Sequence, residues 1–300
     1  MKKVVITGVG GFIGRNLCEL LLSKEIQVIG VDISEDCFDG FTDNALFTPV
    51  IADFGKYSNL SDIIVDRDID VFYHFAWNGT FGAPFKDAKL QLDNSKYAVA
   101  AMDQAITMNC QKFVFAGTCN EYEAQTIACK DEYNARYTNV YGTSKLAADL
   151  ILRAKASLEG IEYCSGLIAI VYGNGMNPNN LVNIVMRNFK SGVASKLIEG
   201  NNEYDLIHVS DVAKAFFAIG EKGKNMIRYY VGHKKVKTFK ENITAMRDIL
   251  SSESELLFGE YKEVQYLDYS IIDTYKLYND TGFECEADFA ETMKEAFHYL

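Results

Sequence analysis

Tyr141 and Lys145 are the residues whose spacing first suggests chemistry, because they stand four positions apart in NVYGTSKLAADLI, residues 139–151. Apolar residues recur at helical spacing later in this segment, which predicts a helix with both side chains on one face. A free tyrosine has a pKa of about 10, too high for efficient proton transfer at neutral pH. A nearby ammonium group would lower that pKa. The pair is a candidate proton carrier with its activating lysine, and the small residues between them would leave room for ligands. The alternative is a surface helix with this spacing by chance.

A glycine-rich loop near the N-terminus predicts a site for a dinucleotide. The segment VVITGVGGFIGRNL places Gly8, Gly11 and Gly14 directly after a predicted strand and directly before a predicted helix. The first glycine allows a tight turn, the second lets the backbone approach a pyrophosphate, and the third lets the helix pack close to the sheet. The helix N-terminus offers free N–H groups to the phosphates. Phe12 and Ile13 are expected to contact the same cofactor. The alternative is a plain glycine turn.

Two acidic residues at predicted strand ends refine this expectation. Asp32 ends the second strand, in VIGVDIS, and Asp53 ends the third. A carboxylate at Asp32 can accept hydrogen bonds from both hydroxyls of the adenosine ribose and would repel a 2′-phosphate. No Arg or Lys follows it nearby. NAD is therefore expected in preference to NADP. Asp53 is a second candidate acceptor, with a helix N-cap or turn residue as an equal alternative.

The alternation of strands and helices in the first half predicts the fold class. Nearly continuous apolar runs, typical of strands buried on both faces, lie at residues 4–7, 27–31, 49–52, 71–75, 112–116 and 163–170. Helix-like stretches lie between them, at residues 12–23, 89–108 and 137–159. This alternation predicts an α/β protein with a doubly wound parallel sheet. After Gly173 the pattern changes to helices mixed with short strands.

Composition narrows the classes of partner. Hydrophobic residues make up 48% of the 300 residues, enough for a large core. A net charge of −11 without a Lys/Arg run argues against nucleic acid and anionic membranes as partners. The seven cysteines are scattered and form no CxxC, and the four histidines lack metal-ligand spacing, so neither disulfides nor a metal are expected. No stretch approaches a signal peptide or a membrane span. A reducing cytoplasm is therefore the expected location.

The combination of motifs resembles the extended short-chain dehydrogenase/reductase family, in its NAD-dependent epimerase/dehydratase group. The matching pieces, in family order, are TGVGGFIG, Asp32, Ala52–Phe54, His74–Ala76, Asn94, FVFAGT, Tyr141-x-x-x-Lys145, VYGNG at 171–175 and DLIHVSDVA at 205–213. Each is loose alone, but together they are specific. The resemblance implies a Rossmann domain and a smaller, mostly C-terminal substrate domain. We expect residues 1–172 with 205–232 in the first, and 173–204 with 233–300 in the second.

The resemblance also implies roles for individual residues. Tyr141 would carry the proton, and Lys145 would hold the nicotinamide ribose as well as favour the phenolate. Thr118, after the fifth predicted strand, would bond the reacting sugar oxygen or the phenol and orient hydride transfer. Asn94 would support the site through hydrogen bonds. The remaining expected cofactor contacts are Asp53, Phe54, Phe75, Ala76 and Trp77. Trp77 could equally be a half-buried structural anchor.

Departures from the family pattern bear on the reaction. Dehydratases of the family place an acid, usually Asp–Glu, directly after the residue that matches Thr118. Here those positions are Cys119 and Asn120, and neither is an efficient acid for expelling a hydroxyl. Both are instead expected to contact substrate, and a 4,6-dehydratase is disfavoured. Two positions where the family often has an Arg for the substrate diphosphate lack it. Asn180, Arg187 or Lys190 are the expected substitutes, with a solvated helix face as an equal alternative.

Two hypotheses of different class follow. The first is an enzyme that moves a hydride between NAD(P) and C4 of a nucleoside-diphosphate sugar, by epimerisation or by reduction of a keto sugar. Asp32 favours epimerisation, and the EYE stretch at 121–123 favours reduction. A homodimer is an expected assembly. The second is a non-catalytic dinucleotide-binding protein that senses redox state. Such a protein has no need of Tyr141 and Lys145, which this chain keeps.

Overall fold

The computed structural model describes residues 1–131, 136–250, 252–262 and 267–300. The chain divides into two compact units. The first comprises Met1–Ile168, Ala213–Val231 and Tyr266–Phe283; the second comprises Ala169–Val212, Gly232–Gln265 and Glu284–Leu300. This division departs from the expected boundaries in four places. Residues 169–172, 205–212 and 232 fall in the second unit, and Tyr266–Phe283 falls in the first.

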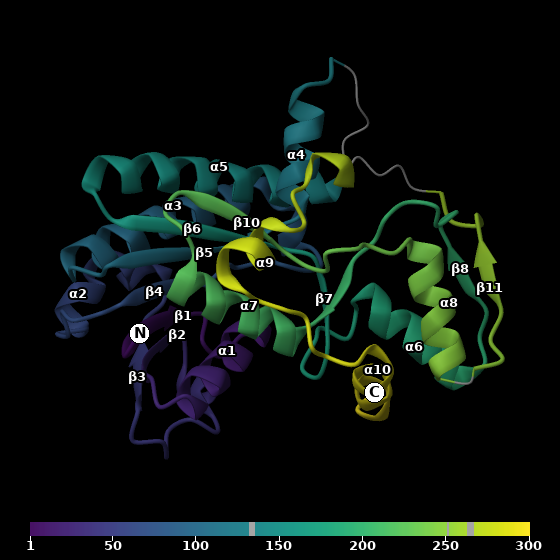
Figure 1. Ribbon diagram of the computed structural model, residues 1–300, viewed down its shortest axis with the longest axis horizontal. Coiled ribbons are helices and arrows are strands. Elements are labelled where there is room, and N and C mark those ends of the chain that lie inside the picture. The colour runs from purple at the N-terminus through teal and green to yellow at the C-terminus, as the bar shows by residue number, and fades with distance from the viewer. Residues whose placement is uncertain (132–135, 251, 263–266) are drawn as a thin grey trace. The chain divides into compact units, whose positions relative to one another are not determined.

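A parallel seven-stranded sheet forms the centre of the first unit, in the order β10-β6-β5-β4-β1-β2-β3 (Figure 1). Its strands are β1 (Lys3–Thr7), β2 (Gln27–Asp32), β3 (Phe47–Ile51), β4 (Val71–His74), β5 (Lys112–Thr118), β6 (Glu162–Ile168) and β10 (Ile227–Val231). The chain order reverses between β1 and β4. In open α/β sheets ligands bind at such a point, outside the carboxyl ends of the strands. The predicted doubly wound sheet is confirmed.

Helices cover both faces of this sheet (Figure 1). On one face lie α1 (Phe12–Ser23) and α7 (Val209–Lys222), and on the other lie α3 (Ala88–Thr107) and α5 (Tyr137–Glu159). Shorter helices are α2 (Leu60–Ile63), α4 (Asn120–Ala128) and α9 (Lys276–Thr281), and single 3₁₀ turns lie at Glu35–Phe38, Phe54–Asn59, Pro84–Lys86 and Tyr269–Ile271. Gly160 ends α5 with a φ of 76°, as its glycine predicted.

The core under α3 and α5 fixes the position of α5. Phe113 and Phe115 of β5 are fully buried in one cluster with Ala101 of α3 and with Ala148 and Leu152 of α5. Large rings on the sheet and small residues on the helices allow close packing. The helix that carries Tyr141 and Lys145 is therefore held against β5 by buried apolar surface.

The second unit contains three helices and two parallel strand pairs. The helices are α6 (Leu181–Ser191), α8 (Phe239–Ile249) and α10 (Phe289–His298). The pairs are β7 (Ile170–Tyr172) with β9 (Leu206–His208), and β8 (Ser195–Leu197) with β11 (Leu256–Phe258). Each helix begins at a residue whose side chain accepts a backbone N–H, namely Asn180, Thr238 and Asp288. Across the described ranges, no helix combines the length and apolarity that crossing a membrane requires.

Two local expectations were wrong. The run 163–170 is two strands, because β6 ends at Ile168 and the amide of Ile170 instead donates to the carbonyl of Asp205, starting a different sheet. Helix α4 was not predicted, because NEYEAQTIA has little helical apolar periodicity.

Candidate active site

Tyr141 and Lys145 lie on one face of α5, as predicted, at the carboxyl end of β5. Lys145 is 3% exposed, and its Nζ donates to the carbonyl of Ala116 at 2.7 Å. The same nitrogen lies 3.9 Å from the centroid of the Trp77 ring. The phenol ring of Tyr141 meets Trp77 edge-on at 6.3 Å and Phe85 at 4.9 Å. Aromatic rings therefore surround the pair on the side of the loop that follows β4.

The small residues between Tyr141 and Lys145 serve close packing. A Cβ on Gly142 would stand 2.6 Å from the carbonyl oxygen of Asn120, so any side chain there would push α5 away from the start of α4. Ser144 is buried, and its carbonyl accepts a hydrogen bond from Ser95 of α3 at 2.9 Å. Gly142 and Ser144 thus allow α5 to pack closely against α4 and α3 next to Tyr141 and Lys145.

Thr118 ends β5 beside Tyr141. Its side chain is buried, its hydroxyl accepts from the amide of Asn120 at 3.3 Å, and its interaction with the phenol lowers the pKa of Tyr141. Cys119 is buried at the N-cap of α4, and Asn120 is part-buried in its first turn. The structure therefore brings Thr118, Tyr141 and Lys145 together, with Cys119 and Asn120 next to them.

The electrostatics of the pair differ from the expectation. Desolvation raises the pKa of Tyr141 above its ordinary value, the negative charge of Glu121 raises it further, and the interaction with Thr118 opposes both. In the protein alone the pKa of Tyr141 is therefore raised; the expected lowering, to which a bound nicotinamide ring would contribute, stays a prediction. Burial also lowers the pKa of Lys145, and attraction to Glu121 opposes that change. The protonation state of Lys145 is thus set by the balance between its burial and the negative charge of Glu121.

The glycine loop has the close approaches that a dinucleotide turn requires. Gly8 has a φ of 73°, and a Cβ there would lie 2.8 Å from the amide nitrogen of Ala76. A Cβ on Gly14 would lie 2.1 Å from the carbonyl oxygen of Gly8. Gly11 is the N-cap of α1, and the part-exposed Phe12 and Ile13 follow it. The loop fits the role expected from its spacing, because side chains at Gly8 or Gly14 would close it.

Asp32 is tied to this loop. Its Oδ2 accepts the amide of Gly10 at 2.8 Å, and its Oδ1 accepts the amide of Ile33 at 2.8 Å. Gly10 was not among the predicted residues, although a Cβ there would meet the Cβ of Cys37 at 2.6 Å. The two consecutive glycines in GVGG were the sequence signal that could have identified Gly10. The carboxylate therefore stands beside the turn that would receive the pyrophosphate.

The loop after β4 is held by α3. Asn94 is buried, its side-chain amide donates to the carbonyl of Asn78 at 2.8 Å, and its oxygen accepts the amide of Asn78 at 3.0 Å. Trp77 Nε1 donates to Gln91 at 2.7 Å. Trp77 is thus anchored and also faces Lys145, so its two expected roles are compatible.

The other expected cofactor residues lie near the same strand ends. Phe75 and Ala76 directly follow β4 and are part-exposed, with the Phe75 ring 4.7 Å from that of Phe216. Phe54 stacks on Tyr97 at 4.6 Å. Asp53 is exposed at the N-cap of the 3₁₀ turn that follows β3, and its side chain makes no capping hydrogen bond. Their contact with a cofactor stays a prediction.

Asn180 and Arg187 belong to the second unit. Asn180 caps α6 by accepting the amide of Val182 at 2.8 Å, and Arg187 is part-exposed on the same helix. Their expected contact with a substrate diphosphate stays a prediction.

A buried group of charges behind Thr118 was not predicted. Glu121 turns inward from α4 and pairs with Arg228 of β10, which also pairs with Asp149 of α5. The spacing of Tyr141, Lys145 and Asp149, four residues apart each time on α5, was a signal for it.

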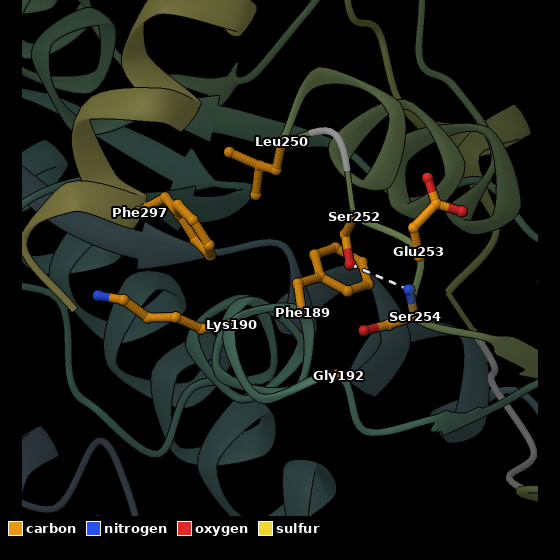
Figure 2. A pocket seen from close by; sticks show the side chains of 8 residues that line it. All are labelled: Phe189, Lys190, Gly192, Leu250, Ser252, Glu253, Ser254 and Phe297. Atoms are coloured by element: carbon orange, nitrogen blue, oxygen red, sulfur yellow. Dashed lines mark hydrogen bonds between the residues drawn. The ribbon is translucent and has the colours of Figure 1, made fainter.

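The second unit carries a cavity of about 540 Å³ between α6, α8 and α10 (Figure 2). Its walls are Phe189, Lys190, Gly192, Leu250, Ser252, Glu253, Ser254 and Phe297. Figure 2 shows the amide of Ser254 bonded to Ser252, at 3.2 Å. Of the residues expected to contact the substrate diphosphate, Lys190 lines this cavity.

Known proteins resemble the chain both in sequence and in three-dimensional structure. A trifunctional UDP-glucose 4,6-dehydratase/UDP-4-keto-6-deoxy-D-glucose 3,5-epimerase/UDP-4-keto-L-rhamnose-reductase of Arabidopsis thaliana is 25% identical over 280 residues, 87% of this chain and 40% of the relative. The chain therefore spans well under half the length of that relative. A dTDP-glucose 4,6-dehydratase from Bacillus anthracis, solved with NAD, matches with a TM-score of 0.80 and 20% identity over 100% of this chain and 96% of that one. A UDP-glucose 4-epimerase from Thermotoga maritima, solved with UDP-glucose, matches with a TM-score of 0.78 and 19% identity over 99% of this chain and 98% of that one.

The solved structures show the shared fold. Family membership rests on a broader match, since the model of the NAD dependent epimerase/dehydratase family covers residues 4–232, from β1 through β10. The chain belongs to the NAD dependent epimerase/dehydratase family.

Proposed function

We propose that this protein is an NAD-dependent enzyme that acts at C4 of a nucleoside-diphosphate sugar, by epimerisation or by reduction of a 4-keto sugar. The observation that carries the proposal is the meeting of Thr118, Tyr141 and Lys145 at the carboxyl end of β5, with Tyr141 close enough to Thr118 for its pKa to be affected and Lys145 buried against Ala116. The family to which the chain belongs agrees with this chemistry.

The residues present fit NAD. The turn at Gly8, Gly11 and Gly14 would take the pyrophosphate at the N-terminus of α1, since side chains at two of these positions would fill it. Asp32 would take the adenosine ribose. The loop after Asp32 adds Glu35, Asp36 and Asp39, all acidic, which disfavours a 2′-phosphate. Bound NAD would supply a hydride acceptor and donor.

The side chains around Tyr141 would handle the proton. Thr118 lies beside the phenol and can orient a sugar hydroxyl toward it. Tyr141 would take that proton at its phenolic oxygen or return it. Because the pKa of Tyr141 is raised in the protein alone, its ionisation would need additional positive charge near the ring. The positive nicotinamide ring of bound NAD would supply such charge, and the ammonium form of Lys145, one turn along α5, can also hold a ribose hydroxyl.

Cys119 and Asn120 support the assignment of reaction type. Neither is a carboxylic acid, and both directly follow Thr118. Glu121, the next residue, points into the protein and is 0% exposed, so it does not replace the missing acid toward a substrate. We therefore disfavour elimination of a sugar hydroxyl and favour reversible hydride transfer.

One experiment tests the whole proposal. The purified protein is denatured, and the released small molecules are identified by mass spectrometry. The protein is then incubated with UDP- and dTDP-linked glucose, galactose, glucuronic acid and N-acetylglucosamine, and with 4-keto sugars plus NADH. We expect released NAD and a C4-epimerised or C4-reduced product. Binding of NAD without turnover of any of these compounds would instead favour the non-catalytic redox-sensing alternative.

The proposal includes a homodimer formed through α3 and α5, in the cytoplasm. Leu92 of α3 and Leu150, Ile151 and Leu158 of α5 are 55%, 51%, 50% and 87% exposed, and apolar surface of this kind favours association. Light scattering of wild type and of Ile151→Glu tests the dimer, and an unchanged monomeric mass would oppose it. All seven cysteines are free thiols, which suits a reducing compartment. Localisation of a tagged chain tests the compartment.

A further inference from the structure

Glu121 occupies an unusual position for a carboxylate. It lies in the first turn of α4 and is 0% exposed, and its Oε1 accepts the amide of Thr118 at 3.0 Å. The space it fills exists because residue 117 is glycine, whose Cβ would stand 2.6 Å from that oxygen. Lys145 bonds the neighbouring carbonyl, that of Ala116. Consecutive residues at the end of β5 thus contact a buried acid and a buried base.

Arg228 joins this acid to a second one. Its Nη2 lies 3.0 Å from Oε2 of Glu121, and its Nε lies 2.9 Å from Oδ2 of Asp149. Asp149 is also fully buried and accepts the hydroxyl of Tyr163 at 2.6 Å. The sheet explains the geometry, because Arg228 of β10 pairs in register with Ser165 of β6, which pairs with Phe115 of β5. The guanidinium therefore reaches across the sheet toward α4 and α5.

The charges of this group do not balance by themselves. When ionised, Glu121 and Asp149 carry two negative charges, and Arg228 carries one positive charge. Lys145 precedes Asp149 by one helical turn and is itself buried, so its ammonium ion would balance the remaining charge. A buried ion is costly unless its counter-charge is near. The four side chains together are neutral.

We propose that Glu121 is a positioning residue: with Asp149 and Arg228 it supplies the counter-charge that keeps buried Lys145 an ammonium ion, and it holds the amide of Thr118 in place. The proposal rests on the active site proposed above. It assigns a function to the Glu of the NEYE stretch, which touches neither substrate nor cofactor and acts through Thr118 and Lys145.

Burial sets the net direction of both pKa shifts. Desolvation raises the pKa of Glu121 to about 8, with Asp149 adding to the rise, and lowers the pKa of Lys145 to about 7. The attraction between Glu121 and Lys145 opposes both shifts. Removing the charge of Glu121 should therefore lower the pKa of Lys145 further.

The other titratable groups facing Lys145 are neutral near pH 7. Burial and the positive charge of Lys145 lower the pKa of His74 of β4 to about 3. Desolvation raises the pKa of Tyr141 and that of Tyr163, the second also through Asp149. The remaining neighbours, Trp77 and Phe115, present ring faces to the ammonium group. Among the residues that the structure describes, the two carboxylates are therefore the groups that can supply its counter-charge, and Glu121 acts on it directly.

The test measures the titration of Lys145 without any substrate. Lysine is labelled with ¹³C at Cε, the Lys145 signal is identified by its loss in Lys145→Met, and its shift is followed against pH. Glu121→Gln keeps the size of the side chain and an oxygen for the Thr118 amide but removes the charge. Asp149→Asn removes the other negative charge. Glu123→Gln is the matched control, since Glu123 is a buried acid on the same helix that pairs with Arg136 at 3.1 Å.

The decisive variant is the double one. Glu121→Gln and Asp149→Asn should each lower the midpoint of the Lys145 titration by at least about one pH unit, and Glu123→Gln should not move it. Glu121→Gln combined with Arg228→Gln leaves Asp149 alone against Lys145, so the midpoint should return toward that of wild type. If Glu121 acted through packing alone, the second substitution would not restore the midpoint of the Lys145 titration, and the double variant would titrate no higher than Glu121→Gln.

Three results would overturn the proposal. They are an unmoved midpoint in both single variants, a double variant that titrates no higher than Glu121→Gln, and a double variant that fails to fold by circular dichroism. Because the readout needs no turnover, failure here is distinct from failure of the proposed function. Once a substrate is known, the alkaline limb of kcat/KM should move with the Lys145 midpoint.

Discussion

Replacing Tyr141 by Phe should separate chemistry from stability, because the two effects differ in size. The change removes one oxygen, whose side-chain partner is Thr118, and leaves the ring contacts with Trp77 and Phe85. A hydrogen bond contributes about 0.5–1.5 kcal/mol net, and Tyr141 is part-exposed, so the free energy of unfolding should fall by no more than about 1 kcal/mol. Loss of a positioned acid–base group costs roughly 10²–10⁴-fold in rate, or about 2.7–5.4 kcal/mol in the barrier.

The assay is turnover of the nucleotide sugar identified in the screen, with urea unfolding and NAD titration of the same preparation. NAD affinity should stay close to that of wild type. Tyr172→Phe is the matched control, because it also removes a phenol oxygen that contacts a threonine, Thr292 at 2.7 Å, but in the second unit. We expect its turnover to be unchanged. If folded Tyr141→Phe turned over within a few-fold of wild type, the proton carrier would be another group and the site would have to be reassigned.

Further predictions concern the cofactor and the reaction. Calorimetry should show NAD binding more tightly than NADP, and Asp32→Ala should weaken NAD by roughly ten- to a hundredfold, the loss of a charged hydrogen bond of about 1.5–3 kcal/mol; equal binding of NADP by wild type would contradict this. Lys145→Met should weaken NAD binding and turnover together, whereas a loss of turnover alone would exclude a ribose contact. No 4-keto-6-deoxy product should form from a nucleoside-diphosphate glucose, and its detection by mass would reverse the branch assignment. Because its pKa is raised, Tyr141 should stay a neutral phenol at pH 10 in the protein alone, so the ultraviolet difference between wild type and Tyr141→Phe should show no phenolate there.

Local sequence patterns predicted the elements that place the site. The bounds of α1, Phe12–Ser23, follow from a glycine loop and a periodic apolar face, and the end of α5 follows from Gly160. Each of these signals acts within a few residues, so it needs no knowledge of the fold. Gly10 was missed because its reason for being glycine, the backbone of Cys37, is brought to it only by the folded loop after β2.

The electrostatics of the site could not be predicted in the same way, because they depend on partners far along the chain. Arg228 lies 107 residues after Glu121. In the sequence, Glu121 and Glu123 alternate with an aromatic residue, and this pattern does not indicate that either carboxylate is buried. The sequence motif therefore located the candidate proton carrier but not the rise in the pKa of Tyr141 in the protein alone, since it contained no measure of burial.

Asp149 shows how far such a prediction could have gone. It follows Tyr141 and Lys145 on the same helix face and stands next to Ala148, on the side that packs against the sheet. A carboxylate on a buried helix face is costly without a cation, so its presence there already required a positive partner nearby. Lys145 alone could have met that requirement, and the sequence offered no reason to look for a second cation. The folded sheet brings Arg228 to Asp149 and Glu121 together, and only then does the count of charges show that Lys145 has a counter-ion of its own.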